Sequence, residues 1–434
     1  PFIFGWQDTS FARKAGLNHM LTVDSIMNSP FVMTNTTTLN IRAMLEPISD
    51  LKVDLNAQHN FGKNTSQLFV SRMQEPYFEY ASTQITGTFS MSIIAIKTAF
   101  FDNKNKNGEY TSKAFDNFRN SRITISRRLA QRRADASNYD PVVMQGDSTL
   151  GFYDGYGRNS QNVLLPAFLA AYTGSNADNF DLKENSFEQG FPGWMSIRPN
   201  WSINYNGLTK LEFVKRYIKT ATINHVYRST FSVGGYMSNP RYDVMGEAED
   251  GFSQMRYEFQ NDFVPRYDVN SASISEMFSP LIGFDLTWIN SLSTKIEIKK
   301  QRTLALSFSN NQLNEMNSNE YVFGAGYRIK DVQVELRTIG GGGKKKMYKS
   351  DINLRADVSI RKSLTYIRKL EEGVTQPTAG QTAITLKTSA DYVLSDRFIL
   401  KIFFDRILTN PIVSTTFKTA NTNFGVSVRF QLVQ

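Results

Sequence analysis

Several short clusters contain residue types that could bind a phosphate or a metal ion. The stretch 340–346 joins four glycines to three lysines and superficially resembles a phosphate-binding loop. Such a loop needs Ser or Thr directly after its first lysine, whereas Lys345 stands there and no helix follows. The alternating asparagines of 103–107 are similar to the start of a calcium-binding loop, but its twelfth position is Ala114 instead of glutamate. We therefore expect a flexible basic loop at 340–346 and no bound metal.

Acidic residues and histidines give no stronger indication of a catalytic centre. Four carboxylates between 243 and 250 could transfer protons, but their glycine-containing segment favours a solvated loop. His19, His59 and His225 are too far apart to predict a metal site by spacing, and His225 aligns with apolar strand positions. The absence of cysteine excludes disulfides, thiol catalysis and cysteine-bound metals. The sequence predicts neither an enzyme nor a cofactor.

Length and charge leave two broad classes of protein open. A chain of 434 residues could form two or three soluble domains or one large β-barrel. Its longest apolar runs are too short for a transmembrane helix, but the half-apolar strands of a membrane barrel remain compatible with them. The net charge of +9 could indicate nucleic acid, yet basic residues alternate with acidic ones at strand spacing. Nucleic acid is therefore not an expected partner.

The strongest signal is a two-residue period of apolar side chains along most of the chain. Near the C-terminus, 424–432 places apolar residues at every even position and Ser427, Arg429 and Gln431 between them. Alternation of this kind gives a strand one apolar and one polar face. The clearest example is 351–361, where apolar residues at even positions alternate with polar or charged ones. Further predicted strands lie at 39–46, 51–58, 85–95, 223–233, 282–288, 304–308, 321–329, 384–394 and 398–404.

Two-faced strands occur in both soluble β-sandwiches and transmembrane barrels. The apolar faces of these strands carry few charges, while the opposite faces combine Arg, Lys and Asp, as a water-filled lumen would. We therefore predict an antiparallel transmembrane β-barrel of about 14–18 strands. Trp288, Tyr327, Tyr348, Tyr392 and Phe430 lie near strand ends and are expected in an interfacial aromatic girdle. By parity alone, the predicted pore-lining residues are Arg355, Asp357, Lys387, Asp391, Lys401 and Asp405.

The pattern divides the chain into strands at 1–100, a helix-containing insertion at 101–200 and a strand meander at 201–434. Helical spacing predicts helices over 113–134 and 164–172, the second ending at Gly174. Predicted short turns are Asn290-Ser291, Lys330-Asp331 and Ser395-Asp396, and predicted longer connections are 340–346 and 371–381.

The helix predicted at 113–134 is rich in arginine and has two interpretations. It could be a solvated amphipathic helix that covers part of the barrel mouth. It could also dock an acidic partner or passing cargo through Arg127, Arg128 and Arg132, because arginine pairs bidentately with carboxylates.

Several segments together resemble the C-terminal part of the SprA/Sov family, the outer-membrane translocon of the type IX secretion system of Bacteroidetes. They keep the order of the family and are spread over most of the chain. The segments are LLPAFLAAYTG at 164–174, NGLTKLEFVKRYIKT at 206–220, HVYRSTFSVG at 225–234, FSPLIGFDLTW at 278–288, LSFSNNQLNE at 306–315, SDINLRADVSIR at 350–361, QPTAG at 376–380 and TANTNFGVSVRF at 419–430.

This resemblance implies that the chain supplies part of a very large single-chain barrel in the bacterial outer membrane. The first strands would then pair with strands that precede residue 1. The implied function is the passage of folded cargo proteins with a C-terminal signal domain from the periplasm to the cell surface. The implied partners are a PorV-type outer-membrane barrel, a periplasmic plug protein, the cargo and outer-membrane lipid.

Two other classes of protein remain as alternatives. A self-contained outer-membrane porin or nutrient transporter of about 16 strands agrees with the strand count. An adhesin or surface protein made of soluble β-domains would also show alternating strands.

Overall fold

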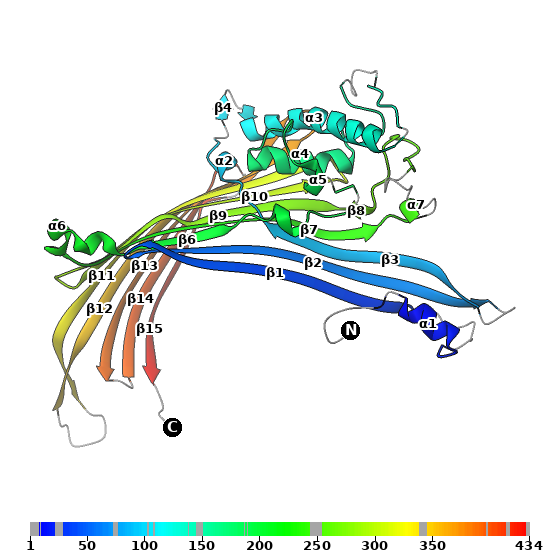
Figure 1. Cartoon of the computed structure of the whole chain (residues 1–434). Helices are drawn as coiled ribbons and strands as arrows, with labels where there is room; N and C mark the ends of the chain where they lie inside the picture. The colour runs from blue at the N-terminus through cyan, green and yellow to red at the C-terminus, as the bar shows by residue number, and fades with distance from the viewer. Residues whose placement is uncertain are drawn as a thin grey trace.

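The computed structural model describes most of the chain. The described residues are 8, 10–21, 29–72, 77–101, 104–106, 109–137, 139–144, 151–185, 187–188, 190–243, 254–337, 345–395, 398–413 and 417–430. They form a large antiparallel β-sheet with the two longest helices gathered over one end of its strands (Figure 1). No helix within these residues is long and apolar enough to cross a bilayer.

Thirteen strands belong to the large sheet, and eleven of them follow one another in a continuous antiparallel path. In spatial order these are β1 (Phe31–Ile48), β2 (Leu51–Arg72), β3 (Tyr77–Ser92), β7 (Ile218–Ser238), β9 (Ser271–Trp288), β10 (Leu292–Ser307), β11 (Gln312–Arg337), β12 (Lys345–Lys369), β13 (Thr375–Ser395), β14 (Phe398–Pro411) and β15 (Thr419–Phe430). Two short strands pair beside this path, β6 (Asn200–Tyr205) with β2 and β7, and β8 (Tyr267–Val269) with β7. A separate hairpin joins β4 (Lys104–Lys106) and β5 (Glu109–Thr111). The all-β antiparallel fold is confirmed.

The strands are longer than the predicted membrane-spanning length. Those of the continuous path contain between 12 residues, in β15, and 26 residues, in β11. A bilayer requires about 9–11 residues per tilted strand. The sheet therefore extends well beyond the thickness of a membrane, and the extra length supports the structures at both strand ends.

The predicted connections are partly right. The turn at Asn290-Ser291 is confirmed between β9 and β10. The predicted turn at Lys330-Asp331 is wrong, because β11 continues through it with a bulge opposite β12. Asp331 has a positive φ of 59°, and its N–H donates to the Asp351 carboxylate. A local bulge of this kind absorbs residues that resemble a turn in sequence.

Two other predicted connections lie around β13. The longer connection at 371–381 is wrong, because β13 begins at Thr375 and pairs with β12 over most of that range, with β14 joining at Gln381. Asp396 of the predicted turn lies outside the described residues, although Ser395 pairs directly with Phe398.

The helices include α3 (Lys113–Ala136) and α4 (Gln161–Thr173), which confirm the helices predicted at 113–134 and 164–172. Gly174 follows α4 in the left-handed conformation, with φ of 67°. The shorter helices are α1 (Phe11–Leu17), α2 (Ile96–Ala99), α5 (Leu182–Asn185), η2 (Trp194–Ser196), η3 (Gly207–Lys210), α6 (Glu212–Lys215) and α7 (Pro240–Asp243).

The segment between β3 and β6, called the insertion below, packs on the sheet through a shared hydrophobic core. Within it, the Phe118 ring of α3 contacts the rings of Phe168 and Tyr172 of α4 at centroid distances of 5.7 and 6.2 Å. Sheet residues on the other side of this core include Phe89, Phe231, Ile274, Leu304 and Leu313. Burial of these side chains is the main source of stability for the contact.

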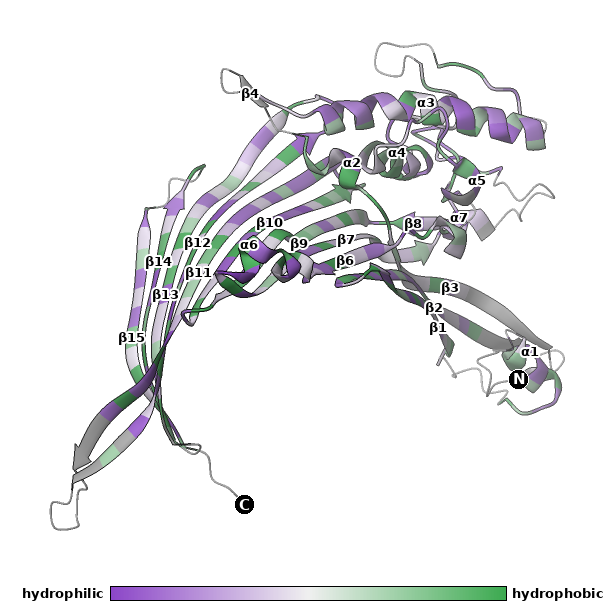
Figure 2. Ribbon diagram, turned by 60° about the vertical axis from the view of Figure 1, so that its left-hand side comes forward, coloured by the Kyte–Doolittle hydropathy of each residue, from purple (hydrophilic) through white to green (hydrophobic). Residues whose placement is uncertain are grey.

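The insertion lies on one definite face of the sheet. We call the face that carries Leu354 and Val358 the outer face, and the face that carries Arg355 and Asp357 the inner face. Register and alternation place Ile274 and Leu304, which contact the insertion, on the outer face. Figure 2 shows the sheet as an arch, with α3 and α4 above it and not in its hollow. The helix 113–134 therefore lies against the outer face at one end of the strands, and its interpretation as a cover of the barrel mouth stays a prediction.

Replacing Gly174 with alanine should loosen the insertion. A Cβ there would lie 2.7 Å from the Lys97 Cβ, and the left-handed backbone costs a non-glycine residue about 1–2 kcal/mol. Under native conditions, we expect a protease to cleave the insertion of the Gly174→Ala variant faster than that of the parent protein. Gly190→Ala is the control, because a Cβ at Gly190 meets nothing within 4 Å. Equal cleavage of both variants would contradict this expectation.

Candidate functional site: the two faces of the sheet

The register of the sheet places charged residues side by side on the inner face. One row crosses eight neighbouring strands of the continuous path, from β7 to β15, with a pattern of acidic, basic and uncharged residues. In order, it contains Thr222, Asp285, Lys295, Gly324, Asp357, Lys387, Asp405 and Asn423. Opposite charges directly across neighbouring strands attract one another, so this row stabilises the pairing as well as lining the face.

Gly324 has a specific place in this row. A Cβ added to it would lie 2.5 Å from the Asp357 Oδ1 and 3.4 Å from the Lys295 Cβ. The missing side chain therefore leaves space for the Asp357 carboxylate to lean across β11 toward Lys295. A larger residue would separate these two charges.

All six predicted pore-lining residues lie on the inner face. Asp357 pairs with Lys387, Lys387 with Asp405, and Asp391 with Lys401. Five of the six border one shallow depression on β12 to β15, namely Arg355, Asp357, Lys387, Lys401 and Asp405. Three of the six predicted residues are basic and three are acidic, so their charges balance. Their role as lining of a pore stays a prediction.

The inner face of β10 is also charged. Glu297 forms ion pairs with Lys295 (2.9 Å) and Lys299 (3.2 Å), its two neighbours on the same face of the strand. Arg42 of β1 and Asp54 of β2 form another cross-strand pair at 3.4 Å. The inner face thus carries charged pairs on strands near both edges of the sheet, although Phe403 and Ile407 of β14 also lie on it.

The outer face carries a continuous apolar band. Its central row contains Ala221, Leu286, Thr294, Ala325, Ala356, Thr388, Phe404 and Phe424. On β12 the band extends from Ile352 to Ile360, and Lys362 and Asn319 begin a polar row beyond it. Eight residue steps span roughly 26 Å, which matches the apolar band of about 25 Å in membrane barrels.

Two further details define the borders of the band. Trp288, Tyr327, Tyr392 and Phe430 have outer-face register near the strand ends opposite the insertion, where an aromatic girdle was predicted. Arg406 is a charged exception on this face, paired with Leu386 near the insertion end. A long arginine side chain can reach toward a polar border.

A wide antiparallel sheet with one apolar and one charged face is the wall of a transmembrane β-barrel.

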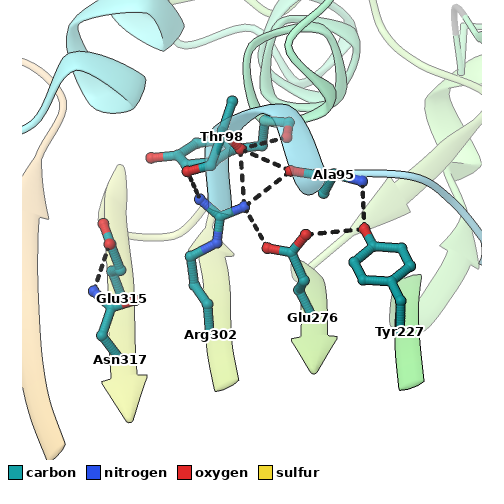
Figure 3. Close-up of polar contacts among 8 residues, drawn as sticks. Ala95, Thr98, Tyr227, Glu276, Arg302, Glu315 and Asn317 are labelled. Carbon is teal, nitrogen blue, oxygen red and sulfur yellow. Dashed lines mark hydrogen bonds and ion pairs between the residues drawn. The ribbon is translucent and has the colours of Figure 1, made fainter. Parts of the chain in front are cut away.

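A buried ion pair fastens the insertion to the sheet just beyond the band (Figure 3). Arg302 of β10 and Glu276 of β9 form an ion pair at 2.7 Å, with only 5% and 1% of their side chains exposed. The Arg302 guanidinium donates to the carbonyl oxygen and the Oγ1 of Thr98 at 2.9 Å. Tyr227 completes the network, donating to Glu276 (2.9 Å) and accepting from the Ala95 N–H (2.8 Å). Three sheet strands thereby hold α2.

A second buried pair repeats this design two strands away. The Nε of Arg368 donates to Glu315 at 2.7 Å, and its guanidinium lies 5.5 Å from the centre of the Phe115 ring in α3. Arg119 of α3 donates to the Leu370 carbonyl oxygen, in the turn between β12 and β13 (3.2 Å). The insertion is thus held by charge as well as by apolar contact.

The sequence interpretation did not identify these two buried pairs. Neither residue lies in a predicted strand, since these covered 282–288 and 304–308. The available signal was parity, because the same alternation continued a few residues further places Arg302 and Glu276 on the apolar side. Their paired burial became apparent only from the register of β9 and β10. A charge at an apolar position indicates a partner in the structure, because an unpaired buried charge is costly.

The three arginines proposed for partner docking lie together on α3. Their described acceptors are the Asp178 carboxylate for Arg127 (2.8 Å), the carbonyl oxygens of Ala177 (2.6 Å) and Phe180 (2.7 Å) for Arg128, and that of Leu182 for Arg132 (3.2 Å). These side chains therefore hold the segment 177–182 against α3. Binding of an acidic partner stays a prediction, and such a partner would compete with these internal contacts.

The other candidate groups have structural contacts or lie outside the described residues. A ring nitrogen of His225 lies 2.5 Å from the Leu281 carbonyl oxygen, and one of His59 lies 3.0 Å from that of Pro192. The glycines 340–343, Asn103, Asn107 and most of the acidic cluster at 243–250 are outside the described ranges. Within those ranges, no group of three or more His, Cys, Asp or Glu residues could hold a metal ion.

Asp262 is a buried carboxyl group in the connection between β7 and β8, away from the apolar band. Its Oδ1 accepts a hydrogen bond from the Gly157 N–H at 2.6 Å, which joins this connection to the insertion. Burial, with a smaller contribution from Asp154, raises the pKa of Asp262 from 3.8 to about 6. The native state therefore binds a proton more tightly than the unfolded chain, and ionised Asp262 reduces stability above pH 6.

Comparisons with known proteins add little to this description. No protein-family model matches the chain, and no curated protein sequence is similar to it. Among solved structures, in-vitro folded OmpT, an outer membrane protein of Vibrio cholerae in its trimer form, is 8% identical over 93% of this chain and 99% of that one, with a TM-score of 0.23. A TM-score this low carries no argument, so the fold assignment rests on the strand order and the two faces.

Breaking the buried pair on one side should release the insertion. Glu276→Met leaves Arg302 buried without its carboxylate, which costs about 3–5 kcal/mol. We expect limited proteolysis to cut the insertion of this variant much faster than that of the parent. The double variant Glu276→Met with Arg302→Met should recover most of the resistance, because no charge is left unpaired. Equal resistance of the single variant and the parent would exclude the clamp.

Acidification should stabilise the contact between the insertion and the β7–β8 connection. From pH 7 to pH 5, Asp262 gains a proton in the native state first, so stability should rise by on the order of 1 kcal/mol. Unfolding of this contact can be followed by denaturant titration with a fluorophore on the insertion. Asp262→Asn should remove most of the dependence between these pH values. A parent protein that loses stability at pH 5 relative to its Asn variant would contradict the assignment.

Proposed function

We propose that this chain forms part of the wall of a wide bacterial outer-membrane channel that conducts folded proteins. The observation that carries the proposal is an eleven-strand arch that remains open. Within the described residues, β1 pairs only with β2, and β15 only with β14. The two edge strands lie at the two feet of the arch in Figure 2.

An open edge is not stable in lipid, because its backbone N–H and C=O groups need partners there. Further strands must therefore join β1 and β15 or connect them. Eleven strands spaced about 4.8 Å apart already form an arc of roughly 50 Å, yet the arc is far from a closed ring. The complete barrel then needs many more strands, and barrel diameter grows with strand number. This curvature favours a channel wider than the porin alternative of about 16 strands.

The chemistry of the inner face also supports the passage of proteins. Its residues are mostly hydroxyl, amide or charged side chains of both signs, and the large apolar side chains among them, such as Ile399, Phe403 and Ile407 of β14, are interspersed with these. A surface of this kind offers a passing protein neither an adhesive apolar patch nor a field of one sign.

The finer proposal is membership of the SprA/Sov family and service in type IX secretion, which rests on the sequence resemblance. Folded cargo with a C-terminal signal domain would pass through the barrel to the cell surface. A pore this wide must be closed when idle, so we include a periplasmic plug protein and a PorV-type barrel as proposed partners. The chain itself would contribute a passage and no chemical step, with energy supplied elsewhere.

A charge on the outer face should impair membrane assembly, whereas a charge on the adjacent inner position should not. Val358 lies near the middle of the apolar band, and Ser359 is next to it on the inner face. An arginine in lipid at this depth costs about 2–4 kcal/mol. We expect Val358→Arg to reduce the folded, heat-modifiable fraction of the full-length protein in the membrane, and Ser359→Arg to leave it unchanged. The reverse ranking would contradict the membrane assignment.

Electrical recordings on the full-length protein can test the channel and its proposed cargo. After removal of the plug protein, we expect a conductance well above that of a porin and passage of a folded fluorescent cargo fusion. Changing Arg355, Lys387 and Lys401 together to glutamate should shift ion selectivity toward cations, because the inner face becomes acidic. A pore limited to ions and sugars would favour the porin or nutrient transporter, and an unchanged selectivity would place these residues away from the conduction path.

A further inference from the structure

The strand ends opposite the insertion carry an exposed apolar segment at 206–217, between β6 and β7. It contains η3 and α6, and Figure 1 places α6 at the far end of the strands from α3 and α4. Leu211, Phe213 and Tyr217 expose 46%, 71% and 61% of their surfaces, and the neighbouring Ile289 exposes 61%. All four residues lie at this end of the strands, and their side chains are left exposed by the described residues.

The segment is fixed and not a loose loop. The Asn206 N–H donates to the Asp50 carbonyl oxygen (3.0 Å), and Lys210 donates to the Ser49 Oγ (2.9 Å). At its other end, the Ile289 N–H donates to the Tyr217 carbonyl oxygen (3.1 Å). The segment is therefore fastened both to the β1–β2 turn and to the β9–β10 turn, which holds its apolar side chains outside the protein core.

The segment 206–217 begins next to the outer face of the sheet. Tyr205 at the end of β6 pairs with Leu51 and Ile223, both outer-face residues. A Cβ on Gly207 would lie 2.5 Å from the Tyr205 hydroxyl, so η3 begins directly against that ring. The segment thus leaves the sheet at the border of the apolar band, at the level of the girdle residues Trp288 and Tyr327.

The charges of the segment fit an anionic surface. Lys215, Arg216 and Lys219 are exposed around the apolar side chains, with Glu212 as an acidic residue among them, whereas Lys210 forms an ion pair with Asp50. Aromatic side chains beside lysine and arginine are typical of structures that sit at the headgroup level of a bilayer. A phosphate-bearing lipid surface satisfies both properties, because headgroups attract the cations and the acyl boundary accepts the apolar side chains.

We propose that 206–217 is a fixed interfacial anchor that inserts Phe213 and Tyr217 among phospholipid headgroups and fixes the height of the sheet in the bilayer. This inference rests on the proposed membrane location and specifies which segment contacts the lipid headgroups. The anchor would resist sliding of the long strands along the membrane normal, which their length alone does not prevent.

Single-cysteine labelling can test the anchor. These 434 residues contain no cysteine, and any cysteine elsewhere in the full-length protein is first replaced by serine. The full-length protein would carry an environment-sensitive fluorophore at Phe213→Cys, in vesicles of phosphatidylcholine and phosphatidylglycerol with spin-labelled lipids. Leu354→Cys in the apolar band is the lipid-exposed reference. Phe259→Cys, on a residue that is 98% exposed beside the insertion, is the water-exposed reference.

We expect quenching at position 213 by headgroup spin labels to exceed that at 259 severalfold, with a blue-shifted emission. Lys215→Gln with Arg216→Gln should lower this quenching and its dependence on the phosphatidylglycerol fraction. Water-like emission at 213 with lipid contact at 354 would overturn the anchor alone. Water-like emission at both would overturn the membrane location. Protection at 213 that requires a co-purified protein would assign the segment to a protein partner and also overturn the anchor.

Discussion

Strand register is the constraint on which the rest of this structure depends. Because successive side chains point to opposite faces, a one-residue slip between two strands would exchange the apolar and charged faces. From β10 to β15 the pairing is free of shifts throughout the apolar band, and shifts occur only toward the strand ends. Rows that continue across every strand therefore keep lipid-compatible residues on one side. The same rows keep Asp357, Lys387 and Asp405 on the other side.

The insertion depends on the same register but uses the outer face differently. Beyond the polar row at Lys362, outer-face positions carry Arg302, Glu276, Glu315 and Arg368 in buried pairs, where lipid could not accept them. The outer face thus changes from a band suited to acyl chains to a surface suited to α2 and α3. Long strands make this possible, because each one contributes to two environments along its length.

The width of the sheet and its open edges both follow from the requirement that a membrane barrel closes on itself. A narrow barrel of few strands closes on itself and fills its interior with side chains. An arch of eleven strands with a polar hollow gains space for a large solute, but its edge strands remain unsatisfied until other strands join them. Acidic and basic residues alternate along the rows of this hollow, so neither sign of charge dominates it.

The sequence by itself determined the two-faced strands, the helices of the insertion and the side on which Arg355 and Asp391 lie, because these properties follow from local periodicity. It misplaced the Lys330-Asp331 turn, since a bulge and a turn use the same residues. Only the tertiary structure decided that the insertion rests on the outer face and that Arg302 meets Glu276. Such contacts join residues far apart in sequence, and their energy comes from desolvation and register, which no local pattern records.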